Sequence, residues 1–240
     1  INPPDANEIY TLVQPNEDYR TIYARIARYL GDPKISEDEF VARAATILRK
    51  LQSDDRVQNI AHGVRVPFCI PRMDVADYGT ALEEVFLPAV EHAFTAMFPK
   101  YDFQNICKGQ LAGNINAVLR SNHKRMIQLL KERGPIVGCY FPTALTGFSV
   151  NACLEQMATL PCEFMLSGGL DAAAAFIGSP NLLMSKERYP FTLDLTGIEH
   201  KIKKGYVFDF EAYGYNLRFK TRSHHAHASD ACAGGLTILG

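Results

Sequence analysis

A glycine turn at residues 167–171 is the segment of this sequence that most directly suggests chemistry. It reads Ser167-Gly168-Gly169-Leu170-Asp171. Glycines allow a main chain to approach a phosphate closely, and the N–H groups at the start of a helix point toward an anion. Apolar residues precede the turn and an alanine-rich stretch follows it. The sequence therefore predicts a strand, a turn and a helix, and the turn is a candidate phosphate-binding loop.

The turn resembles the nucleotide-binding loop of the ATP pyrophosphatase superfamily, which reads Ser-Gly-Gly-x-Asp-Ser between a strand and a helix. The resemblance covers six residues, and Ala172 stands where that pattern has its second serine. It implies that Ser167, Gly168, Gly169 and Asp171 hold the phosphates of a nucleotide. The alternative interpretation is a tight turn that caps the next helix, with Gly168 or Gly169 at positive φ.

A histidine-rich segment at residues 224–230 is the second candidate. If it forms a strand, the rings of His225 and His227 lie on one face, because alternate side chains of a strand point the same way. Imidazole nitrogens and carboxylate oxygens are common zinc ligands, and Asp230 would supply a third. The segment thus suggests a metal-dependent hydrolase, with a polar, loosely ordered tail as the structural interpretation.

Other reactive residues are better explained by structure. Asp74, Asp77, Glu83 and Glu84 fall in the first turns of a helix predicted over residues 74–98, where their charge complements the helix dipole. The six cysteines contain no Cys-x-x-Cys pair, and several lie in apolar, strand-like stretches that predict buried thiols. No Gly-x-Ser-x-Gly or His-Glu-x-x-His motif occurs. A complete catalytic set is therefore not visible in the sequence.

Charge and hydropathy exclude several classes of partner. There are 25 Lys and Arg residues against 26 Asp and Glu residues, so no basic excess predicts binding to duplex nucleic acid. No apolar run approaches the roughly 18 residues of a membrane-spanning helix. A chain of 240 residues can bury a large core without disulfides, so we predict a reduced, cytoplasmic protein.

The elements that must position these residues change in character along the chain. Residues 1–62 read as a helical hairpin: Ser36 and Glu39 form a capping box before the second helix, and a short helix is predicted over residues 54–62. Residues 63–240 mix helices with strands. Pro67 restricts the strand at residues 64–70 to an edge of the sheet or to the end of a strand. Period-two alternation on both sides of Gly214 predicts an antiparallel hairpin.

Together these patterns predict one α+β domain, residues 1–240, in which the helical hairpin packs on a mixed sheet with flanking helices and the sequence ends in the β-hairpin. The function we predict is non-catalytic binding of a ligand or a protein partner, because no complete catalytic set is present. Tyr213 and Tyr215, at the hairpin turn, are candidates for a partner surface. The alternatives are the nucleotide-binding enzyme and the metal-dependent hydrolase. The identities of any cofactor and substrate stay open.

Overall fold

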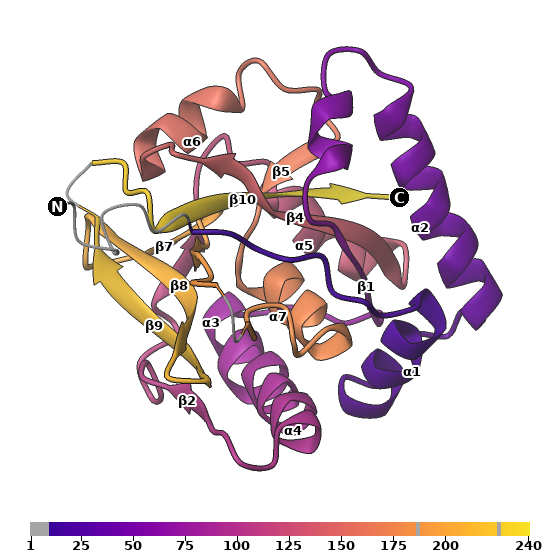
Figure 1. Ribbon diagram of the computed structural model, residues 1–240, viewed down its shortest axis with the longest axis horizontal. Helices are drawn as coiled ribbons and strands as arrows, with labels where there is room; N and C mark the ends of the chain where they lie inside the picture. Colours follow the sequence, from indigo (N-terminus) through magenta and orange to yellow (C-terminus); the bar gives the residue numbers. More distant parts are fainter. Residues whose placement is uncertain (1–9, 186–187, 225–226) are drawn as a thin grey trace, which may run out of the picture.

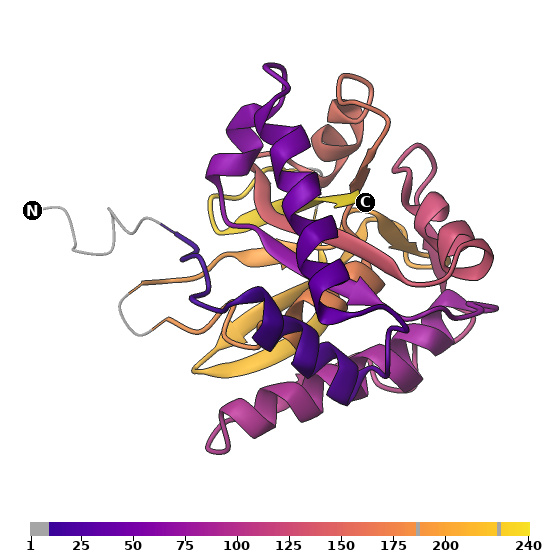
Figure 2. The ribbon, with the colours of Figure 1, turned by 90° about the vertical axis from the view of Figure 1, so that its right-hand side faces the viewer.

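The structure, a computed structural model, describes residues 10–185, 188–224 and 227–240. It is an α+β fold in which helices pack against a mixed sheet (Figures 1 and 2), as predicted. The helices are α1 (Tyr19–Tyr29), α2 (Glu37–Gln52), the 3-10 helix η2 (Gln58–His62), α3 (Tyr78–Ala81), the π-helix η3 (Leu82–Phe86), α4 (Leu87–Met97), α5 (His123–Glu132), α6 (Val150–Gln156) and α7 (Gly169–Gly178).

The main sheet has the strand order β1-β4-β10-β6-β8-β9-β2, and β5 pairs with β10 off this path. The strands β3 and β7 form a separate two-stranded sheet. Bounds are β1 (Val66–Ile70), β2 (Phe103–Asn105), β3 (Ile115–Ala117), β4 (Ile136–Thr146), β5 (Phe164–Leu166), β6 (Thr192–Asp194), β7 (Ile198–His200), β8 (Tyr206–Tyr213), β9 (Asn216–Ser223) and β10 (Cys232–Leu239).

The N-terminal helices begin and end where the sequence signals place them. The Oγ of Ser36 accepts a hydrogen bond from the Glu39 N–H at 3.1 Å, so the predicted capping serine opens α2. Gly31, just after α1, has a φ of +114°, a backbone conformation that favours glycine. The edge position predicted for the strand containing Pro67 is confirmed, because β1 is the terminal strand of the sheet.

The predicted hairpin is formed by β8 and β9, which pair antiparallel from Tyr206 opposite Ser223 to Tyr213 opposite Asn216. Gly214 and Tyr215 both have positive φ, as the tight turn between twisted strands requires. One further strand follows the hairpin: β10 lies inside the sheet between β4 and β6. The residues after 231 are therefore part of the core and not a loose tail.

Helix α7 is buried along its whole length and forms the centre of the core. It packs against α1, α4 and β1, and the ring of Phe176 lies 4.5 Å from the ring of Phe210 on β8. The alanines at residues 172–175 allow these neighbours to approach closely. The glycine turn, which opens α7, is consequently placed in the interior of the protein.

Candidate functional site

The glycine turn has the predicted strand, turn and helix around it. It joins β5 to α7, so Ser167, Gly168, Gly169 and Asp171 do come together. Ser167 and Asp171 are nevertheless completely buried, with 0% of either residue exposed. The turn is an internal structure and not an exposed loop.

The main-chain N–H groups of the turn are already bonded inside the protein. Gly168 donates to Asp171 Oδ1 at 2.9 Å. Gly169 and Leu170 donate to the hydroxyl oxygen of Tyr78 at 2.8 and 3.1 Å. The phenol thus occupies the place at the helix N-terminus where a phosphate oxygen would accept these bonds. This conformation contains no open anion cradle and gives no support to the phosphate-loop hypothesis.

The hydroxyl of Tyr78 also lies 2.8 Å from Nε2 of His123. Because its oxygen already accepts two N–H groups, its proton donates to Nε2. Nε2 of His123 is then an acceptor, so the single N–H proton of the neutral ring lies on Nδ1, which donates to the Leu166 carbonyl at 3.2 Å. Burial lowers the pKa of His123, which agrees with a neutral ring held in one tautomer.

The turn caps the start of α7, but positive φ, which the tight-turn interpretation expected at Gly168 or Gly169, is wrong: the two glycines are required by space. Gly168 has a φ of −122°, and Gly169 is absent from the positive-φ residues. A Cβ added to Gly168 would lie 2.4 Å from the ring of His123. A Cβ added to Gly169 would lie 2.6 Å from Leu82. Close packing at the start of α7 therefore accounts for both residues.

Asp171 belongs to a buried cluster that also contains Tyr78, His123 and Gly168. Its Oδ2 accepts a hydrogen bond from the Thr237 hydroxyl of β10 at 2.6 Å. Burial raises the pKa of the carboxyl group, while His123 and these hydrogen bonds act in the opposite direction. The side chain holds the turn, the helix start and β10 together, which is a structural role.

The histidine-rich segment has no strand among its described residues, 224 and 227–230. It connects β9 to β10, and His227 and Asp230 are both exposed. His225, the other proposed ligand, lies outside the described residues. Within the described ranges, no group of three or more His, Cys, Asp or Glu side chains is arranged to hold a metal ion. The described part of this segment thus provides no geometric support for the metal hypothesis.

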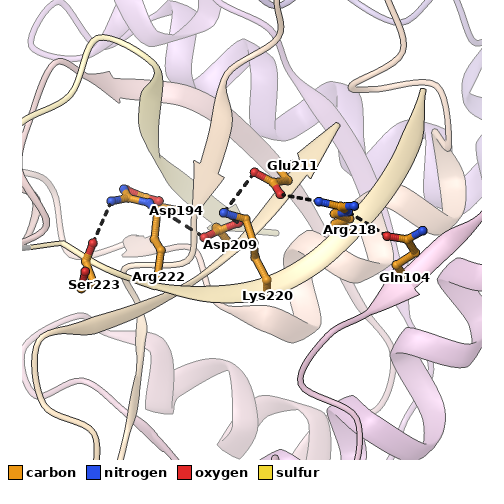
Figure 3. A network of polar contacts seen from close by, with 8 residues as sticks. All are labelled: Gln104, Asp194, Asp209, Glu211, Arg218, Lys220, Arg222 and Ser223. Atoms are coloured by element: carbon orange, nitrogen blue, oxygen red, sulfur yellow. Dashed lines mark hydrogen bonds and ion pairs between the residues drawn. The ribbon is translucent and has the colours of Figure 1, made fainter. Parts of the chain in front are cut away.

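A network of charged side chains crosses the outer strands of the sheet (Figure 3). Arg222 of β9 donates to Asp194 Oδ2 of β6 at 2.6 Å. Lys220 lies 3.0 Å from Glu211, and Arg218 donates to the side chain of Gln104 at 2.7 Å. The three basic side chains are about one quarter exposed, so the network is half-buried.

Asp209 lies beneath this network and is completely buried. Neither of its carboxyl oxygens has a hydrogen-bond partner among the described residues. Its nearest cations are Lys220 Nζ at 3.8 Å and Arg222 Nε at 3.9 Å, beyond hydrogen-bond distance. Burial raises the pKa of Asp209 to about 8, and neighbouring Asp194 acts in the same direction. This shift favours the protonated form of Asp209 at neutral pH.

Sequence reasoning did not find this pair of acids. Alternation along the hairpin places Asp209 and Lys220 on one sheet face, and they are direct partners in the observed register. Asp194 comes from another strand, β6, and is opposite Asp209 in an antiparallel pair. The sequence signal that could have indicated this site is a row of acidic residues on one hairpin strand opposite basic residues on the other. It contains no information about β6.

A groove of about 310 Å³ lies between α2 and the end of β10. These two elements are neighbours in the ribbon view (Figure 1). Its floor is formed by Ile47 and Leu51 of α2, Phe164 of β5 and Ile238 of β10, each at most 7% exposed. Small-molecule sites are concave, mostly apolar and typically ~300–1,000 Å³ in volume. The groove has the composition of such a site, at the lower end of this size range.

The rim of the groove is charged but largely self-compensated. Arg43 lies 3.6 Å from Glu39 and donates to the Gly240 carbonyl at 2.9 Å. Asp54 forms a 2.6 Å ion pair with Arg56. Apart from these pairs, the charged side chains that line the groove are Lys50 and Glu163, around an apolar floor.

Family models, curated proteins and solved structures contain no match to this chain. Any functional conclusion must therefore come from the geometry above. Along the described ranges, no helix combines the length and the apolar content that crossing a bilayer requires.

Proposed function

We propose that this protein is a non-catalytic binding protein, and that its ligand is an uncharged, mostly apolar small molecule held in the groove between α2 and β10. The observation that carries the proposal is the preformed apolar floor. Ile47, Leu51, Phe164 and Ile238 are held in place by a helix and two strands, so the cavity needs no rearrangement to form. Binding to a preformed site avoids the cost of ordering its walls.

The rim favours an uncharged ligand. Arg43 and Asp54 are engaged with protein partners, so a charged ligand would have to compete with existing ion pairs. Burying an unpaired charge is expensive, whereas apolar area removed from water contributes ~25 cal/mol per Å². The floor can supply that apolar contribution.

The lining of this groove contains neither Asp194 nor Asp209. It also contains no member of the buried cluster around Asp171. A ligand in the groove would therefore not touch these acids, whose pKa values are raised by burial. This separation favours binding over catalysis at the groove.

A fluorescence titration tests the proposal. The neutral dye N-phenyl-1-naphthylamine becomes brighter in apolar surroundings, and we expect saturable binding at micromolar concentrations. Ala42 is exposed and lines the groove, so Ala42→Phe would place a ring in the cavity. We expect this variant to weaken binding at least tenfold, about 1.4 kcal/mol.

The matched control is Ala96→Phe, which adds the same ring at an exposed position of α4 away from the groove. We expect its affinity to stay within twofold of the parent. Equal weakening by both variants, or the absence of saturable binding in the parent, would refute the proposal.

Two further predictions from the sequence belong to this proposal. The nearly balanced charge supports the absence of duplex nucleic acid binding, and a gel-shift titration at low salt tests it. Cytoplasmic location is likewise proposed, on the basis of buried, free cysteines such as Cys69, whose pKa is raised to about 12 by burial. Localisation of a tagged chain would test this second prediction.

A further inference from the structure

A second cavity, of about 470 Å³, lies between α4 and the segment that contains β2. Its inner wall is apolar and includes Leu87, Pro88 and Phe103. Leu87 and Phe103 are buried, at 1% and 9% exposed. The groove described above shares no lining residue with this cavity, so the two sites are independent.

Glu83 fixes the outer wall of the cavity. Its carboxylate accepts main-chain N–H groups from Leu111 at 3.1 Å, from Ala112 at 3.4 Å and from Gly109. A Cβ added to Gly79 would lie 1.8 Å from the Leu111 carbonyl oxygen, so this loop rests directly on the helix. The cavity is therefore preformed, with a rigid loop facing a helix.

The helix wall presents two carboxylates on one side. Glu84 and Glu91 are seven residues apart, which is about two helical turns and places both on one face together with Leu87 and Pro88. The π-helix η3 lies at the start of this face, and short π-helical segments within α-helices occur frequently at functional sites. Pro88, which has no N–H group, is accommodated directly after it.

These carboxylates have no structural task in the described part of the chain. Asp77 caps α3 by accepting from Thr80 N–H at 2.8 Å, and Asp74 lies 3.4 Å from Lys131. Neither Glu84 nor Glu91 forms an ion pair within 4 Å among the described residues, although both line the cavity. Of the four acids predicted to be structural, Glu84 alone lacks such a contact.

We infer that this cavity binds an organic cation: an ammonium group attached to an apolar body. The apolar wall would hold the body, and the carboxylates of Glu84 and Glu91 would hold the charge. Three carboxylates and one ammonium, that of Lys108, line the cavity, so its charge is complementary to a cation. An anion of the same shape would meet repulsion.

Isothermal titration with three ligands of one shape tests this inference. The cation 2-phenylethylammonium, the neutral 2-phenylethanol and the anion 3-phenylpropionate share a phenyl ring and a two-carbon chain. We expect submillimolar binding of the cation, at least tenfold weaker binding of the alcohol and no binding of the anion. Sodium chloride should weaken the binding of the cation, because exposed carboxylates are screened.

Variants locate the charge. The double substitution Glu84→Gln and Glu91→Gln preserves size and should weaken cation binding at least tenfold, leaving the alcohol unaffected. The control is Glu155→Gln, an exposed glutamate of α6 far from the cavity in sequence. Equal affinity for the cation and the alcohol, or equal losses in the double variant and the control, would overturn the inference. Loss of dye binding in the Ala42→Phe variant concerns only the groove, so the two proposals fail separately.

Discussion

Asp171 and Asp209 are two completely buried aspartates in one core, yet their surroundings differ. Asp171 accepts hydrogen bonds from the Gly168 N–H and from the Thr237 hydroxyl. Asp209 has no hydrogen-bond partner among the described residues and only two cations at 3.8 and 3.9 Å. Burial raises the pKa of both carboxyl groups, but hydrogen bonds offset part of this effect only at Asp171.

The difference separates a structural acid from a proton-binding one. Buried polar groups in folded proteins are nearly always hydrogen-bonded, because an unsatisfied group costs free energy. Asp171 follows this rule and organises the start of α7. At Asp209 we expect the carboxyl group to keep its proton, because a neutral carboxyl group costs less free energy to bury than a carboxylate. The two residues should therefore respond differently to substitution and to pH.

Removal of Asp171 should have the largest effect. In Asp171→Ala, the Gly168 N–H and the Thr237 hydroxyl lose their acceptor inside the core. At ~1–3 kcal/mol for each unsatisfied group, we expect the free energy of unfolding to fall by about 2–6 kcal/mol. Urea unfolding measures this, with the exposed Asp230→Ala as the control. A change of the same size in both variants would show that Asp171 does not have this structural role.

The pH dependence of Asp209 should be the next largest effect. Its folded-state pKa of about 8 lies above the ordinary value of 3.8. Between these values the unfolded chain releases the proton and the folded chain retains it. The free energy of unfolding therefore falls as pH rises from about 4 to 8, and this contribution is constant outside that window.

Asp209→Asn removes the titrating proton and keeps a neutral side chain. The stability of the variant relative to the parent should rise by about 2–5 kcal/mol between pH 5 and pH 8.5. Urea unfolding at several pH values provides the profile, and Asp230→Asn, at an exposed position, is the matched control. Parallel profiles for the parent and Asp209→Asn would show that the carboxyl group does not hold its proton at neutral pH.

The smallest effect is expected at Ser167. Its buried hydroxyl forms no hydrogen bond of normal geometry among the described residues, although its interaction with the buried Tyr140 hydroxyl lowers the pKa of that phenol against the effect of burial. Because Ser167→Ala breaks no hydrogen bond of normal geometry, we expect a change below about 0.5 kcal/mol in the free energy of unfolding. Thr237→Val, which does break a bond to Asp171, is the comparison and should cost about 1–3 kcal/mol. A loss at Ser167 equal to that at Thr237 would indicate that this hydroxyl is bonded in solution.

Local signals were sufficient for many elements of the fold. The cap at Ser36, the glycine after α1 and the period-two pattern of β8 and β9 depend on residues close in sequence, and each predicted element is present. Asn122 is an exception. It occupies the N-cap position of α5, where asparagine is a favoured type, but its side chain makes no capping hydrogen bond: the amide donates to the Phe164 carbonyl at 2.9 Å, and φ is +61°. Tertiary contact overrode the local preference there.

The candidate sites were much less predictable, because their partners are distant in sequence. The apolar faces, the helix starts and the hairpin could be predicted from the sequence, because they follow from capping residues and from the 3.6-residue and two-residue periods of apolar side chains. The sequence also placed the glycine turn between a strand and a helix. Only the tertiary structure placed Tyr78 at the start of α7 and Asp194 beside Asp209. The choice between an anion cradle and an internal cap depended on a hydroxyl group 91 residues away, a contact that no local pattern encodes.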